Sequence, residues 1–319
     1  PGTAILDLWV MYSAGFADSF GGEPLAKITQ DIEWSNQALV NSGINARYRL
    51  VRSEQIDIEE GIELIPVLDL YYEKSGVFEG ADLKRQELGA DSVMIYVVNA
   101  ESADGDGIAC GFAPMMSTGT QGDFAKAIKK EDLVATIGVP CVANAFTHEL
   151  GHNLGLVHSR AQGDRGGSFF WSRGHGVQDE FATLMAYPQA YATIPFLAST
   201  TQHYSNPEVL CQGVGCGVAS TDVDYGANAA LHVETVMYQA ASLYGTLGID
   251  SDGDGVPEEE NPVSPDDSLD EIGSTDEVGE ETDSGSASFE GKKYRWIDRL
   301  IWTDVQWIEY VNDTKVNTY

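Results

Sequence analysis

HELGHNLGLVH, the segment from His148 to His158, carries the spacing H-E-x-x-H-x-x-G-x-x-H. In a helix, residues four apart lie one turn above each other, so His148 and His152 can present both imidazoles to one metal ion about 2.0–2.1 Å away. Gly155 tolerates the positive φ of a sharp turn, which would end the helix and return His158 as a third ligand. A fourth tetrahedral position then stays open for water, which predicts a catalytic zinc site.

Glu149 follows the first ligand and is predicted to lie beside the metal-bound water and not on the ion. Zinc lowers the pKa of its water towards about 7, so Glu149 can act as general base for attack on a peptide carbonyl and then protonate the leaving amine. The alternative is a helix whose histidines only satisfy hydrogen bonds in the core. Three of the six histidines in the chain lie in this one segment, which favours the metal site.

Around this segment, strand and helix patterns alternate. Apolar runs predict strands at Ala4–Tyr12, Ala46–Ser53, Ser92–Val98, Gly107–Phe112 and Leu133–Ile137. Helical spacing predicts helices at Pro24–Asn41, Ile62–Glu73, Ala81–Leu88, Asn144–Leu154 and Ala227–Leu247. The stretch from Gly155 to about Gly226 is rich in Gly, Ser, Pro and Asn and is predicted to be mostly irregular. The order of elements indicates an α/β fold.

The composition excludes some classes of function. The chain has 319 residues, of which 43% are hydrophobic, and this is enough for a substantial core. Its 50 acidic and 18 basic residues give a formal charge of −32, which would repel nucleic acid and anionic lipid. The acidity suits solubility or cation binding. No run of about 18 apolar residues predicts a membrane span, and the start at Pro1 leads us to expect a processed or trimmed form.

These residues resemble the metzincin superfamily of zinc endopeptidases, whose signature is the three-histidine motif followed by a methionine-containing turn. In FATLMAYP, Phe181–Pro188, the resemblance places Met185 beneath the metal, where it packs and does no chemistry. Tyr187 stands where some metzincins have a tyrosine that ligates zinc or hydrogen-bonds the tetrahedral intermediate. A role as a wall residue is the alternative for Tyr187.

Within the superfamily, the chain is most similar to bacterial reprolysin-type, adamalysin-like peptidases. The similarity rests on Asn36–Val51, Gly89–Val98, the approach from Cys141 to the zinc helix, and His203–Val209. One position departs from the pattern, because Ser159 follows the third histidine, as in matrix-metallopeptidase-like members, where reprolysin-type enzymes usually have Asp. The resemblance covers about Thr3–Leu247. It implies a twisted, mostly parallel sheet with long helices, an active-site helix, a Met-turn and a C-terminal helix.

The resemblance also implies where a substrate lies. In metzincins the substrate is extended across the cleft and pairs with an edge strand above the zinc helix. Gly107–Phe112 is our candidate for that strand. Its candidate substrate-binding residues are Gly107, Ile108, Ala109 and Gly111. Tyr187–Ile194 would form part of the wall of the specificity pocket.

Four cysteines permit three pairings, and an even count in a secreted protein favours full pairing. We expect the disulfides Cys110–Cys141 and Cys211–Cys216. Zinc ligation by these cysteines is the competing interpretation, but the sequence contains no C-x2-C pair.

The composition changes at Gly248. Residues 250–283 hold 15 acidic and no basic residues, so this stretch cannot collapse by itself. Within it, DSDGDGVPEEEN resembles calcium-binding loops, with Asn261 in place of the usual final Glu. The calcium ligands would be Asp250, Asp252, Asp254 and Glu258. A disordered acidic linker is the alternative.

The C-terminal residues are aromatic-rich and indicate two short strands, too few to hold a core alone. They either dock on the main domain or belong to a larger module. We therefore expect a catalytic domain at 1–247, an acidic linker at 248–286 and an aromatic β tail at 287–319. His175, His203 and His232 lack metal spacing and are expected to be hydrogen-bonded or surface residues.

The sequence thus predicts a secreted, monomeric zinc endopeptidase that acts on protein or peptide substrates, with one catalytic Zn²⁺, Ca²⁺ in the acidic loop, and an inhibitory pro-segment in its precursor. The alternative is a secreted adhesin or surface-binding protein that uses the zinc fold as a scaffold. The intact Glu149 argues against the adhesin.

Overall fold

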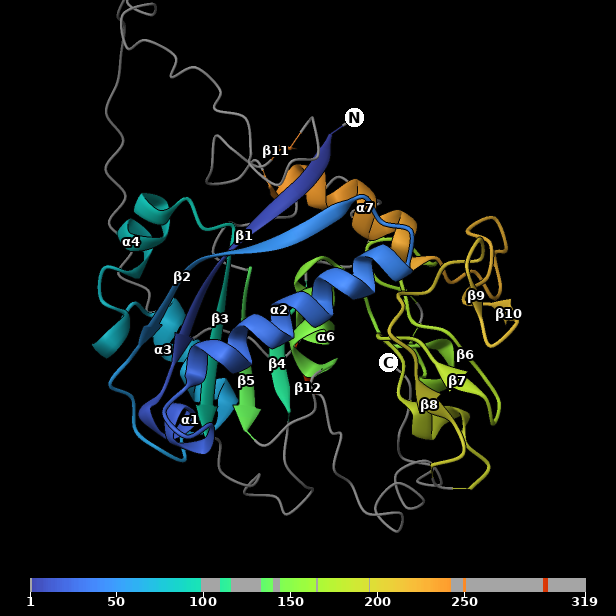
Figure 1. The fold of residues 1–319 in the computed structure, drawn as a ribbon. Helices are drawn as coiled ribbons and strands as arrows, with labels where there is room; N and C mark the ends of the chain where they lie inside the picture. The colour runs from blue at the N-terminus through green and yellow to red at the C-terminus, as the bar shows by residue number, and fades with distance from the viewer. Residues whose placement is uncertain are drawn as a thin grey trace, which may run out of the picture.

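A computed structural model describes residues 2–98, 110–115, 133–139, 144–164, 166–194, 196–241, 249–250 and 295–297. Its main element is a seven-stranded sheet (Figure 1). The strands are β1 (Thr3–Tyr12), β2 (Ala46–Gln55), β3 (Ser92–Val98), β4 (Gly111–Pro114), β5 (Val134–Val139), β11 (Ile249–Asp250) and β12 (Arg295–Ile297). Their order is β11-β1-β3-β5-β4-β12, and β2 also pairs with β1. Strands β2, β1, β3 and β5 are parallel, whereas β4, β11 and β12 pair antiparallel.

Helices cover both faces of the sheet, as expected for parallel strands. The helices of the described residues are α1 (Ala14–Ser19), α2 (Pro24–Asn41), α3 (Leu64–Tyr72), α4 (Ala81–Leu88), α6 (Asn144–Asn153) and α7 (Ala229–Ala240). Strand β1 shows the two faces, because side chains alternate along a strand. Leu8 and Val10 pack in one core cluster with residues of α2, α6 and α7, while Trp9 and Met11 pack in a second cluster with residues of α3 and α4.

The long helix α2 lies across one face of the sheet (Figure 1). It begins at Pro24, whose fixed φ suits the first helical turn, and Gly43 follows its end with a φ of +73°. Its buried residues include Ile28, Ile32 and Leu39, at the helical spacing that the sequence predicts. Helix α2 contacts α6, so the first half of the chain supports the helix that carries the histidines.

The region after α6 consists of short elements held by loops. They are the 3-10 turns η3 (Arg160–Gln162) and η4 (Pro188–Tyr191), the three-stranded sheet β6 (Gly176–Val177), β7 (Phe181–Ala182) and β8 (Ser199–Thr200), and the hairpin β9 (Leu210–Cys211) and β10 (Val214–Gly215). A disulfide joins Cys211 to Cys216 at this hairpin. In Figure 1 the small sheet and the hairpin lie to the right of the main sheet. This agrees with the mostly irregular stretch predicted from the sequence.

Several elements differ from the sequence expectations. Helix α1 is an addition, begun by the Ser13 side chain, which accepts the backbone N–H of Phe16 at 3.2 Å. Strand β11 comes from the segment expected to be a linker, and it pairs with β1 of the main sheet. Strand β12 comes from the tail, where short strands are expected, and it pairs with β4. Among the described parts of the chain, none of the helices combines the length and apolar character that crossing a bilayer requires.

Candidate active site

Helix α6 places His148 and His152 one turn apart on the same face. Their ring centroids are 4.7 Å apart, and their Nε2 atoms lie 3.0 Å from each other. Both rings are buried. The two imidazoles therefore direct the same ring nitrogen to one point.

A backbone carbonyl fixes each of these rings from behind. Nδ1 of His148 donates to the Leu184 carbonyl at 2.6 Å, and Nδ1 of His152 donates to the Leu156 carbonyl at 2.9 Å. A carbonyl oxygen can only accept, so the proton of each neutral ring is on Nδ1. The lone pair on Nε2 is then available to a metal, in the arrangement typical of metal-ligating histidines.

The turn after α6 brings His158 to the same point. Gly155 has a φ of +89°, and the N–H groups of Gly155 and Leu156 donate back to carbonyls of α6 at 2.9 and 3.0 Å. A Cβ on Gly155 would lie 2.4 Å from the Ser168 hydroxyl, so glycine is needed for space as well as for conformation. Nε2 of His158 consequently lies 3.2 Å from Nε2 of His148.

The three histidines fit a zinc ion. Two nitrogens that each lie 2.0–2.1 Å from a tetrahedral zinc are about 3.3 Å apart, close to the 3.0 and 3.2 Å observed. Burial, together with the neighbouring imidazoles, lowers the pKa of His152 and of His158 well below the usual value. Both rings are therefore neutral at pH 7, the form that binds metal. Converging lone pairs repel each other unless a cation lies between them.

Glu149 extends from α6 towards β4. Its side chain is fully buried. A Cβ built on Gly111 would be 2.5 Å from Oε1 of Glu149, so the carboxylate lies directly against the glycine backbone of β4. The structure thus brings together the predicted base and one of the predicted substrate-binding residues.

Met185 and Tyr187 border the histidines from the turn that follows β7. A Cβ on Gly151 would lie 2.4 Å from Sδ of Met185, so the fully buried methionine packs directly against α6. Gly151 lies between His148 and His152 in the sequence of this helix. The ring of Tyr187 is 4.6 Å from that of His158 and 6.0 Å from that of His148, measured between centroids. Tyr187 therefore forms a wall of the histidine cluster.

Comparison with known proteins shows a similarity to one family of metallopeptidases. Residues 26–159 match the model of the reprolysin-like metallopeptidases, family M12B. A curated relative named peptidyl-Asp metalloendopeptidase, from Pseudomonas aeruginosa strain PAO1, is 30% identical over 268 residues. Over these residues the chain is similar to the reprolysin-like metallopeptidases. The alignment with the relative covers 78% of this chain and 43% of the relative, so the chain spans less than half of the relative's length.

A solved structure supports the fold. One chain of a structure described as a chaperone–substrate complex matches this chain with a TM-score of 0.53 and 17% identity. The match covers 75% of the present chain and 36% of the chain in that complex. At this identity the likeness concerns the fold alone.

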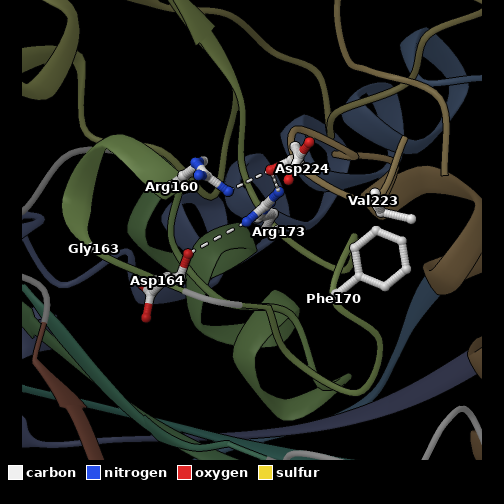
Figure 2. A pocket seen from close by; sticks show the side chains of 7 residues that line it. All are labelled: Arg160, Gly163, Asp164, Phe170, Arg173, Val223 and Asp224. Carbon is white, nitrogen blue, oxygen red and sulfur yellow. Dashed lines mark hydrogen bonds between the residues drawn. The ribbon is translucent and has the colours of Figure 1, made fainter. Parts of the chain in front are cut away.

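Next to the loop that follows His158, the structure has a cavity of about 310 Å³. Its lining residues are Arg160, Gly163, Asp164, Phe170, Arg173, Val223 and Asp224 (Figure 2). The guanidinium of Arg173 donates to the carbonyls of Gly226 at 2.8 Å, Asp224 at 3.3 Å and Asp164 at 3.4 Å. Arg160 also donates to the Asp224 carbonyl. These arginines hold the loops around the cavity together.

Sequence reasoning does not single out Asp164. Its carboxylate lies 3.5 Å from Nδ1 of His158, on the side of the ring away from the other histidines. Burial raises the pKa of Asp164 to about 7. The residues next to Asp164 in the sequence do not indicate its burial, because that burial depends on the contact between its loop and Arg173.

Some predicted residues lie outside the described residues. They are Gly107, Ile108, Ala109, Cys141, Asp252, Asp254 and Glu258. Asp250 is part of β11 and pairs with Thr3 of β1. Cys110 is disulfide-bonded.

The other three histidines take no part in the cluster. Nε2 of His232 donates to the Leu154 carbonyl at 2.7 Å, and burial lowers the pKa of His232 to about 4. His203 lies near Cys211 and Cys216, but those sulfurs are joined to each other and are not thiolate ligands.

Proposed function

We propose that this chain is a reprolysin-like metallopeptidase, a secreted zinc endopeptidase that hydrolyses internal peptide bonds of proteins. The observation that carries the proposal is the convergence of the Nε2 atoms of His148, His152 and His158 beside the buried Glu149 of α6. His148, His152 and His158 would hold the zinc. Zinc bound there supplies a Lewis acid for the peptide carbonyl and lowers the pKa of water.

Glu149 would be the general base. A carboxylate next to the metal ligands can take a proton from the attacking water and deliver it to the leaving amine. Its position against Gly111 supports a peptide path beside β4, because a backbone without a side chain lets a substrate and the carboxylate approach the same point. Tyr187 would hydrogen-bond the developing negative charge, which its place beside His158 and His148 supports.

The substrate would pair with the outer edge of β4. Strand addition uses backbone hydrogen bonds for affinity and leaves selectivity to the side-chain pockets. Here β12 pairs antiparallel with β4, at Phe112–Pro114. That edge is therefore able to accept an extended segment next to Gly111. The wall of the specificity pocket would include η4.

For selectivity, we propose cleavage at aspartyl residues, which the name of the P. aeruginosa relative supports. The charge of −32 favours the opposite preference through long-range steering of cationic substrates. Cleavage-site profiling on a peptide library separates the two, because enrichment of Asp next to the cut supports the proposal and enrichment of Lys or Arg contradicts it.

The test of the reaction is Glu149→Gln in the zinc-loaded protein. General acid–base catalysis contributes about 10²–10⁴-fold, so kcat should fall by at least about 100-fold while one zinc per chain is retained. Glu33→Gln, the same chemical change on the exposed side of α2, should stay within a few fold of the parent. A Glu149→Gln variant that binds zinc and cleaves casein at the parental rate would contradict the assigned role.

The remaining sequence predictions belong to the same proposal. The disulfide Cys211–Cys216 supports an oxidising, extracellular location. Calcium binding by the acidic loop from Asp250, an inhibitory pro-segment, a monomeric state and the division into 1–247, 248–286 and 287–319 are also proposed. The pairing of β11 and β12 with the main sheet supports docking of the tail on the catalytic domain.

A further inference from the structure

The loop after the third histidine is closed by one glutamine side chain. Ser159 follows His158 and begins the turn η3, and Gln162 ends it. Oε1 of Gln162 accepts the Ser159 hydroxyl at 2.8 Å and the Ser159 backbone N–H at 3.3 Å. Ser159 is fully buried. The residue next to the third histidine is thus held from both its backbone and its side chain.

The same oxygen reaches across to the segment after Met185. Oε1 of Gln162 also accepts the backbone N–H of Tyr187 at 3.0 Å, although the two residues are 25 apart in sequence. Tyr187 is the residue whose ring lies 4.6 Å from the ring of His158. A single acceptor therefore links the loop of the third histidine to the backbone of the tyrosine that packs on that histidine.

The hydrogen bonds between Ser159 and Gln162 explain why serine is suitable at position 159. A serine supplies both a hydroxyl and a backbone N–H to one amide oxygen, in a capping box that fixes the start of η3. The hydroxyl of Tyr191 in η4 also hydrogen-bonds the Ser159 side chain. Turns η3 and η4 are in this way joined by Gln162 at one end and by Ser159 at the other.

We propose that Gln162 is a positioning residue for catalysis, which acts by holding Tyr187 at a fixed orientation to His158. The inference rests on the proposed peptidase function and extends it to a residue that does not touch the substrate. Partners in the outer shell of a metal site set the orientation of the groups around it, and their loss costs about 10–100-fold in activity or metal affinity. Because Gln162 acts on Tyr187, its loss should lower kcat and leave KM nearly unchanged.

The test compares three substitutions in the full chain. Gln162→Met keeps the length and removes the acceptor, and we expect kcat to fall about 10–100-fold with one zinc per chain retained. Gln162→Glu keeps an acceptor at the same place and should recover kcat to within about threefold of the parent. Gln162→Asn retains an amide, but its side chain is one methylene shorter, so its oxygen cannot reach the Tyr187 N–H. It should therefore lower kcat as Gln162→Met does, and it tests the proposal even if the methionine variant folds poorly. Gln212→Met, on the exposed hairpin, is the matched control.

A double variant shows whether Gln162 acts through Tyr187. In a Tyr187→Phe background, Gln162→Met should lower kcat by no more than about threefold, because coupled residues are not additive. An equal loss in both backgrounds would overturn the proposal, as would a Gln162→Met variant with parental kcat. A rise in KM alone would also overturn it.

Amide hydrogen exchange supplies a readout that needs no catalytic activity. The Tyr187 N–H should be protected in the parent and in Gln162→Glu, and should exchange faster in Gln162→Met. A parent without peptidase activity but with this pattern would refute the proposed function and leave the Gln162–Tyr187 link intact. Unchanged protection in Gln162→Met would refute the link itself.

Discussion

The Nδ1 atoms of His148 and His152 are bound to carbonyls of Leu184 and Leu156, so the backbone chooses the tautomer of both rings. One of these carbonyls belongs to the residue before Met185, and the other to the turn that leads to His158. The loops that border the cluster therefore also set its chemistry. This dependence predicts that changes in the loops alter metal binding even where no histidine is replaced.

Gly111→Ala tests the contact between β4 and Glu149. The new Cβ would lie 2.5 Å from Oε1 of Glu149, so the carboxylate must move. A displacement of about 1 Å can cost about 100-fold in rate, and we expect kcat to fall by that order with zinc content unchanged. Steady-state kinetics and metal analysis measure the two quantities.

Ala113→Gly is the control in the same strand, because it changes stability without adding bulk near the carboxylate. Its kcat should stay within a few fold of the parent once the samples are compared below their melting temperatures. Parental kcat for Gly111→Ala would show that Glu149 has room to keep its place, contrary to the packing described.

Residue spacing predicts the histidine cluster because its geometry is local: two ligands share one helical turn, and Gly155 sets the return of the third. Gln162 could not be predicted, since its partner Tyr187 is 25 residues away. The burial of Asp164 could not be predicted either, because it depends on the contact of its loop with Arg173.

At the scale of elements, β12 occupies the edge of the sheet that a substrate is proposed to use. Its three residues pair antiparallel with β4, Trp296 opposite Ala113 and Ile297 opposite Phe112. The next residue of β4 is Gly111, which lies against Glu149. A peptide that adds to this edge must displace β12.

Trp296→Pro tests this competition. Proline removes the backbone donor from the middle residue of the three and is poorly tolerated in a paired strand. One net hydrogen bond contributes about 0.5–1.5 kcal/mol, so KM for a peptide should fall roughly two- to tenfold with kcat unchanged. Progress curves at several peptide concentrations give both constants.

Trp296→Ala retains the backbone donor and serves as the comparison, with KM expected near that of the parent. Should Trp296→Pro and Trp296→Ala have the same KM as the parent, β12 does not compete with the substrate for β4.

The sequence predicts the long elements closely and the short ones poorly. Helix α2 has the predicted bounds because Pro24 and Gly43 mark its ends. Strands β11 and β12 are two and three residues long, and their pairing joins positions far apart in the chain, such as Ala4 with Ile249. No local pattern can reveal such pairs, since the partner strand supplies the hydrogen bonds.

The whole molecule carries a formal charge of −32. Such an excess keeps a protein soluble but destabilises its compact state through repulsion, and salt screens repulsion between exposed charges. The positive charge of a bound zinc is small against this total. Stability should consequently depend on ionic strength as well as on metal.

Raising sodium chloride from 20 mM to 0.5 M should increase the melting temperature of the zinc-loaded protein by several degrees. For a domain of this size, 1 kcal/mol corresponds to about 2–4 °C. Differential scanning calorimetry measures the shift, and potassium chloride at equal ionic strength should produce the same effect. A melting temperature that stays constant or falls with salt would mean that charge repulsion does not limit the stability.

The central claim is that three imidazoles of one chain hold a single zinc ion. X-ray absorption spectroscopy of the zinc-loaded protein measures this directly, through the number and type of ligands and their distances. We predict three histidine nitrogens at about 2.0–2.1 Å with one further light atom, and two histidine nitrogens in His158→Ala. A sulfur ligand, or a spectrum that His158→Ala leaves unchanged, would contradict the account.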